Sequence, residues 1–132
     1  MERRIETILY GSKTVAVVGI SDKPDRPSHG VAKYLQERGF RVIPVNPLLT
    51  EVLGEKSYKS LSEIPERVDL VDVFRKSADV PPIAEEAVRI GARFFWMQEG
   101  VGSDRAREIL DAAGIPWIMD RCVKKELAKR GK

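Results

Sequence analysis

Three times along this chain a helical pattern ends at a glycine and an apolar strand follows at once. The three junctions read Gly39-Phe-Arg-Val-Ile, Gly91-Ala-Arg-Phe-Phe and Gly114-Ile-Pro-Trp-Ile. Glycine is the usual residue at the left-handed position that ends a helix, and continuous apolar runs are typical of strands buried on both faces. The repeated unit therefore predicts an α/β fold: a Rossmann-like, doubly wound, mainly parallel sheet with helices on both faces.

The spacing of apolar residues gives approximate positions for the elements of this fold. We expect helices over 4–9, 28–38, 78–90, 103–113 and 122–130, and strands over 15–18, 41–46, 68–74, 92–97 and 115–119. Ser28, Ser77 and Ser103 are suited to begin helices as caps. We expect the first helix to pack on the sheet edge, and residues 48–61 to be irregular, with a turn at Gly54 and a short edge strand at Tyr58.

Length and charge limit the class of protein. A chain of 132 residues fits a single domain, residues 1–132, with a core of its own. The 23 Lys and Arg are intermixed with the 20 Asp and Glu, so the net charge is only +3. Only the tail is visibly basic, with Lys124, Lys125, Lys129, Arg130 and Lys132. We interpret the tail as a solvated helix end whose cations suit the negative end of the helix dipole, and expect no nucleic-acid partner.

Two further features suggest where the protein acts. The single cysteine, Cys122, excludes an intramolecular disulfide and favours a reducing compartment. The charged start of the chain leads into no apolar run long enough for a signal peptide or a membrane span. We therefore expect a cytoplasmic protein with no membrane partner.

Polar residues follow three of the predicted strands. These strand ends are Gly19-Ile20-Ser21, Phe74-Arg75-Lys76 and Gln98-Glu99-Gly100. The carboxyl ends of parallel strands meet at one edge of a sheet, where ligands bind in open α/β folds. We expect the three segments to converge on one crevice.

The loop after the first strand has the residues of a diphosphate cradle. Ser21 and Ser28 carry hydroxyl groups, Arg26 presents a planar guanidinium, and the helix that follows directs N–H groups to the same place. The dinucleotide fingerprint G-x-G-x-x-G is absent, because the next glycine after Gly19 is Gly30. Taken alone, a glycine at a strand end also fits an ordinary tight turn.

The end of the second strand helps to choose between ligands. NAD-dependent dehydrogenases usually place a carboxylate here to hold the ribose hydroxyls, whereas this chain has Asn46 followed by Pro47. A neutral residue is compatible with an adenosine that carries an additional phosphate, as in NADP or coenzyme A. The dipeptide also fits a plain turn.

Several of these segments together resemble a known family. They are Val17-Val-Gly-Ile-Ser21, Arg26-x-Ser28, Pro44-Val-Asn-Pro47, Leu53-Gly54, the run from Asp69 to Arg75, Trp96-x-Gln98-x-Gly100 and Asp120-Arg-Cys122. In this order and spacing they resemble the small stand-alone CoA-binding proteins of bacteria and archaea, whose domain is similar to the CoA-binding half of the succinyl-CoA synthetase alpha subunit. The resemblance runs from about Thr14 to Glu126.

The resemblance implies that coenzyme A lies across the strand ends. By matched position, Gly19, Ile20, Ser21, Arg26 and Ser28 would meet the diphosphate. Asn46 and Pro47 would flank the adenosine, and the pantetheine arm would pass Phe74, Arg75, Gln98, Glu99 and Gly100. The synthetase subunit also has a second domain with a phosphorylated histidine, and nothing in this sequence corresponds to it.

Catalytic and metal-binding patterns are not evident. The single histidine, His29, falls in the first turn of a helix, and Glu85 and Glu86 lie on a polar helix face that we expect to be solvated. No cluster of His, Cys, Asp and Glu has metal-ligand spacing. Cys122 fits a small buried residue, but at the crevice mouth it would be placed to form a mixed disulfide with coenzyme A.

The sequence therefore predicts non-covalent binding of coenzyme A or an acyl-CoA, by a non-catalytic carrier or a regulatory module with an unidentified protein partner. The alternative is an NADP-dependent oxidoreductase that uses the same crevice. That alternative lacks both the glycine fingerprint and a proton donor suited to hydride chemistry.

Overall fold

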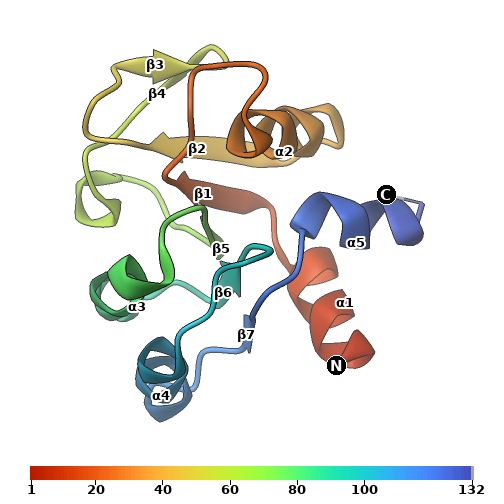
Figure 1. Ribbon diagram of the computed structural model, residues 1–132, viewed down its shortest axis with the longest axis vertical. Coiled ribbons are helices and arrows are strands. Elements are labelled where there is room, and N and C mark those ends of the chain that lie inside the picture. Colours follow the sequence, from red (N-terminus) through yellow and green to blue (C-terminus); the bar gives the residue numbers. More distant parts are fainter. Residues whose placement is uncertain (132) are drawn as a thin grey trace.

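A five-stranded parallel sheet forms the centre of the computed structural model, which describes residues 1–131 (Figure 1). Its strands are β1 (Thr14–Val18), β2 (Arg41–Val45), β5 (Leu70–Val73), β6 (Phe94–Met97) and β7 (Trp117–Ile118). They lie side by side in the order β2-β1-β5-β6-β7, and every neighbouring pair is parallel. The chain thus winds outward from β1 in one direction and from β5 in the other, which confirms the predicted doubly wound α/β fold.

Helices cover both faces of this sheet, as predicted (Figure 1). One face carries α1 (Glu2–Gly11), α2 (Pro27–Glu37) and α5 (Val123–Lys129). The other carries α3 (Val80–Arg89) and α4 (Asp104–Ala112), with the short 3-10 helices η1 (Leu61–Glu63) and η2 (Ser77–Asp79).

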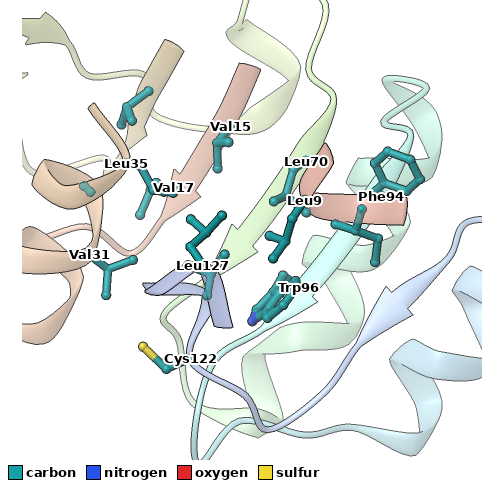
Figure 2. Packing of buried hydrophobic residues seen from close by; sticks show 14 of the residues in the cluster. Leu9, Val15, Val17, Val31, Leu35, Leu70, Phe94, Trp96, Cys122 and Leu127 are labelled. Carbon is teal, nitrogen blue, oxygen red and sulfur yellow. The ribbon is translucent and has the colours of Figure 1, made fainter. Parts of the chain in front are cut away.

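Alternate residues of each strand pack into separate cores on the two faces. On the first face Val15, Val17 and Trp96 meet Leu35 of α2 and Leu127 of α5, as Figure 2 shows. On the second face Ala16, Val71 and Phe95 meet the small residues of α3 and α4. Because both faces are covered, the strands are apolar almost throughout, which is why their sequences show no polar alternation.

Helix α1 packs against the edge strand β7, as predicted. Ile5, Ile8 and Leu9 are buried in the same core as Val15 and Val17, so α1 also covers a face of the sheet. The helix is held there by its amphipathic spacing, which presents three apolar side chains on one side.

Two of the three predicted helix caps are wrong. The residue that precedes α2 is Arg26, and Ser28 lies inside the helix. Asp79 precedes α3, and the hydroxyl oxygen of Ser77 instead accepts a hydrogen bond from the N–H of Gly102 at 3.0 Å. Ser103 does cap α4, accepting from the N–H of Ala106 at 3.1 Å. The hydroxyl groups of Ser28 and Ser77 therefore take part in hydrogen bonds other than helix caps.

The segment predicted to be irregular contains a small hairpin. Its strands are β3 (Glu51–Val52) and β4 (Glu55–Lys56), joined by Leu53 and Gly54, both with positive φ. Gly54 is therefore in a turn, as predicted, and Tyr58 forms the expected edge contact as a parallel bridge to Val45. Two-residue strands are too short to produce a recognisable alternation.

None of the helices in residues 1–131 is both long and apolar enough to cross a membrane.

Candidate functional site

The carboxyl ends of β1, β5 and β6 open into a cleft of about 720 Å³, which we call the main cleft. It lies on the face covered by α2 and α5, and the loops after β5 and β6 form its floor. A smaller hollow of about 220 Å³, the β1 hollow, shares Arg26, Pro27 and Phe74 with it. Both lie where the winding of the sheet reverses, between β1 and β5, the usual position of ligands in such folds.

Gly19 lets the ends of β1 and β5 approach closely at this point. Its φ is +86°, and a Cβ atom there would lie 2.5 Å from the carbonyl oxygen of Phe74. The positive φ strains any other residue, and the contact with backbone leaves no room for a side chain. Gly19 therefore shapes the β1 hollow, which it lines together with Ser21 and Ser28.

The two serines of the β1 hollow are linked to each other. The N–H of Ser21 donates to the hydroxyl oxygen of Ser28 at 2.9 Å, and the hydroxyl oxygen of Ser21 accepts from the N–H of Lys23 at 3.0 Å. In the described part of the chain, neither hydroxyl donates a hydrogen bond of its own. Each O–H is therefore available to an anion in the hollow.

Helix α2 contributes fewer donors than the sequence suggested. Pro27 has no N–H, and the N–H groups of His29 and Gly30 already donate to the carbonyl oxygen of Arg26 at 3.1 Å. The Arg26 side chain lines both the hollow and the main cleft. The positive character of the site thus depends more on this guanidinium than on free helix N–H groups.

The second and third predicted strand ends line the main cleft. Phe74 is half-buried there, and Arg75 forms an ion pair with Asp79 at 3.0 Å. Gln98 is buried, and its amide oxygen accepts from the N–H of Val123, which joins the end of β6 to the start of α5. Glu99 pairs with Lys125 at 3.0 Å, and this hydrogen bond raises the pKa of Lys125.

Four predicted site residues lie outside both the main cleft and the β1 hollow. The side chain of Ile20 is fully buried in the core, and the N–H of Gly100 donates to Asp120 at 2.7 Å. The Asn46 amide donates to the carbonyl oxygen of Ile20 and accepts from the N–H of Leu48, both at 2.8 Å. Pro47 lines a separate hollow beside the β3–β4 hairpin. Asn46 therefore fixes the loop that carries Ser21.

Several lining residues were missed or misread. Lys124 and Lys125 lie in the first turn of α5 and line the main cleft, so the prediction that they sit at the negative end of a helix is wrong. Their position in the first turn of the predicted last helix was the available signal. Val31 and Val101 also line the cleft and were missed. Lys76, which belongs to one of the predicted strand ends, and the buried Cys122 line it too. Lys132 of the predicted tail lies outside the described residues.

One buried carboxyl group lies on the same side of the sheet as the main cleft. Asp72 has no exposed surface, and neither of its oxygens has a hydrogen-bond partner in residues 1–131. It is two residues before Phe74 on β5, with Val17 and Trp96 as its register neighbours. Burial raises the pKa of Asp72 well above its usual range, because the charged carboxylate is disfavoured where no water and no hydrogen-bond donor reach it.

The arrangement suits an elongated anion with an apolar arm. The β1 hollow offers two hydroxyl groups and a guanidinium to phosphate, and the adjoining main cleft has apolar walls from Val31, Phe74 and Val101. Neither cavity is lined by His29, and residues 1–131 include no group of three His, Cys, Asp or Glu side chains placed to hold a metal ion.

Comparison with known proteins points to one family. A family model described as "CoA binding domain" matches residues 13–128. The chain is 47% identical over 120 residues to the uncharacterized protein YneT of Bacillus subtilis, a match that covers 91% of this chain and 89% of that protein. A solved structure of a hypothetical protein from Pyrococcus horikoshii superimposes with a TM-score of 0.94 at 37% identity, covering 98% of this chain and 91% of the other.

Larger enzymes contain a similar segment. The ADP-forming acetate–CoA ligase II of Archaeoglobus fulgidus is 31% identical over 114 residues, which is 80% of this chain and 17% of the ligase. The chain thus matches only a small part of that enzyme's length.

Proposed function

The chain belongs to the CoA-binding domain family, and from this membership we propose that it binds coenzyme A or an acyl-CoA non-covalently in the β1 hollow and main cleft. One observation carries the proposal. At the switch point of the sheet, the β1 hollow, with its two serine hydroxyl groups, opens directly into a cleft that has apolar walls from Val31 and Val101, and Arg26 and Phe74 are common to both. This combination matches a ligand with a diphosphate joined to a long, uncharged arm.

The order of the strands supports one direction for the ligand. In this proposal the adenosine end lies near Asn46 and Pro47 after β2, and the diphosphate near Gly19, Ser21, Arg26 and Ser28 after β1. The pantetheine arm then passes Phe74 and Arg75 after β5, and Gln98, Glu99 and Gly100 after β6. Strands lie about 4.8 Å apart, so the ends of β2 and β6 are separated by roughly 14 Å.

Ile20 and Asn46 have indirect roles in this proposal. Ile20 contributes its backbone, because its side chain is in the core, and its carbonyl oxygen is held by the Asn46 amide. Asn46 thereby acts as a positioning residue for the loop at the diphosphate.

We propose that the protein does not transform its ligand. The main cleft is lined by Cys122, Asp25 and Glu99 but by no histidine, so it lacks the cysteine–histidine pair that commonly activates a nucleophile. A carrier or regulatory module that keeps an acyl-CoA intact fits this lining, and a regulatory role would require a protein partner whose binding depends on the ligand.

Amide chemical shifts during titration with CoA test the location of the site. We expect the largest changes at Gly19, Ser21 and Gln98, and little change at Tyr10 and Phe40, which line a separate hollow between the ends of α1 and α2. Changes confined to Tyr10 and Phe40 would contradict the proposed site. Incubation with acetyl-CoA should release free thiol no faster than buffer does, and faster release would contradict the non-catalytic role.

A further inference from the structure

The main cleft contains more positive charge than its own carboxylates neutralise. Five cationic side chains line it, with only two acidic ones, Asp25 and Glu99. The five cations are Arg26, Arg75, Lys76, Lys124 and Lys125. Arg75 pairs with Asp79 and Lys125 pairs with Glu99, each at 3.0 Å. Among residues 1–131, Lys76, Lys124 and Arg26 have no acidic partner.

The two lysines come from different segments that line the cleft. Lys76 follows β5 and immediately precedes η2, whereas Lys124 lies in the first turn of α5. In residues 1–131 neither ammonium group has a carboxylate partner, and Lys124 lies over the ring of Tyr34, 5.3 Å from its centroid. An anion that reaches both lysines would meet two cations without a carboxylate partner in the described part of the chain.

These lysines are separate from the diphosphate region. The β1 hollow is lined by Gly19, Ser21 and Ser28 with Arg26, and neither Lys76 nor Lys124 takes part in it. In the proposed direction of the ligand, the ends of β5 and β6 meet the far part of the pantetheine arm, which is uncharged. Coenzyme A alone therefore brings no negative charge to Lys76 and Lys124.

We propose that the preferred ligand is an acyl-CoA whose short acyl chain ends in a carboxylate, and that Lys76 and Lys124 bind this carboxylate. The inference rests on the proposed function, because it takes the thiol end of the ligand to lie in the main cleft. The acyl chain itself would contact the apolar walls formed by Phe74 and Val101. Exposed pairs of this kind contribute modestly, so about two- to fivefold in affinity is expected from each lysine.

Two matched ligands isolate the contribution of the carboxylate. Malonyl-CoA and isovaleryl-CoA have acyl groups with the same connectivity of non-hydrogen atoms, in which two carboxylate oxygens replace two methyl groups. Calorimetric titration at physiological salt should give about tenfold tighter binding of malonyl-CoA to the parent protein, from two charge-assisted contacts. In the double variant Lys76→Gln/Lys124→Gln the two ligands should bind with nearly equal affinity.

A control variant removes the same charge elsewhere. Lys13 and Lys33 are exposed and line none of the four hollows, so Lys13→Gln/Lys33→Gln should keep the preference for malonyl-CoA. If the parent protein binds CoA but binds malonyl-CoA and isovaleryl-CoA with equal affinity, the inference is overturned and the proposed function stands. If the Lys76/Lys124 variant instead loses affinity for CoA but not for 3′-dephospho-CoA, the lysines hold the ribose phosphate and the inference is wrong. Failure of CoA itself to bind would contradict the proposed function.

Discussion

The N–H of Ser21 donates a hydrogen bond to the hydroxyl oxygen of Ser28 at 2.9 Å, which joins the loop after β1 to the first turn of α2. Ser28 is buried and Ser21 is half-buried, so the bond is partly shielded from water. It holds the two hydroxyl groups of the β1 hollow in a fixed relation, so the proposed phosphate site and the stability of the loop depend on the same bond.

Replacing Ser28 should affect both stability and binding. Ser28→Ala leaves the Ser21 N–H without its partner, so the free energy of unfolding should fall by about 1 kcal/mol and CoA should bind more weakly. Ser21→Ala is the matched comparison, because it keeps the backbone donor and removes only a hydroxyl that accepts from the exposed Lys23 N–H. Urea unfolding and calorimetric titration of both variants measure the two effects. An unchanged unfolding free energy for Ser28→Ala would show that the bond has no structural role.

Arg26 lines the β1 hollow together with both serines, and we assign it to the diphosphate. Arg26→Ala should therefore weaken CoA and 3′-dephospho-CoA by the same factor, about tenfold for the loss of a charge-assisted contact. Lys33→Ala, on the exposed side of α2, serves as the control for the loss of one positive charge. A selective loss of CoA affinity would instead assign Arg26 to the ribose phosphate.

Asp72 should reduce stability at neutral pH. Its pKa is raised by burial, so the folded state binds the proton more tightly than the unfolded state does. The contribution of Asp72 to the free energy of unfolding is fully present below the pKa of an unfolded aspartate, about 4. It is lost as the pH rises from there toward the pKa of Asp72 in the folded state. Asp72→Val has a similar shape and no polar atoms, and it should raise the unfolding free energy by about 1 to 3 kcal/mol at pH 7.

The gain in unfolding free energy from Asp72→Val should be smaller at pH 3.5 than at pH 7. At pH 3.5 the Asp72 carboxyl of the parent protein is mostly protonated in both the folded and the unfolded state. Chemical unfolding at the two pH values measures this, with Glu85→Gln as the control for an exposed carboxylate. If Asp72→Val is less stable than the parent protein at pH 7, the Asp72 carboxyl makes a stabilising polar contact in the folded protein, and the prediction is wrong.

Cys122 lines the main cleft and remains a candidate for a mixed disulfide. In that reaction the Cys122 thiolate attacks the disulfide of oxidised CoA, a new sulfur–sulfur bond forms, and one CoA leaves as its thiolate. Intact-mass measurement should show a single CoA adduct that dithiothreitol removes. Since Cys122 is the only cysteine, Cys122→Ser should show none. The absence of any adduct in the parent protein would contradict the prediction.

Much of the fold was predictable because local chemistry determines it. Gly39, Gly91 and Gly114 all have positive φ where helices end, and each is followed by the next strand of the sheet after at most two residues. The apolar runs locate the strands, although β5, β6 and β7 are shorter than predicted. The convergence of the three polar strand ends follows from parallel topology alone.

Contacts between distant segments could not be predicted. Asn46 looked like a ligand-facing residue or a turn, but it binds the carbonyl oxygen of Ile20, 26 residues earlier. Glu86 was expected to be solvated, yet it accepts hydrogen bonds from the N–H groups of Leu61 and Ser62 and so supports η1. Lys124 and Lys125 were misplaced because the whole basic tail was treated as one helix end, although both residues lie in the first turn of α5.

Parallel calorimetric titrations of the protein, stripped of bound ligand, with CoA and NADPH test the central claim most directly. Both ligands carry a diphosphate and an adenosine with an additional ribose phosphate, and they differ in the arm that the main cleft must accept. The account predicts one CoA bound per chain and little or no heat with NADPH. Selective binding of NADPH would contradict it and restore the oxidoreductase alternative.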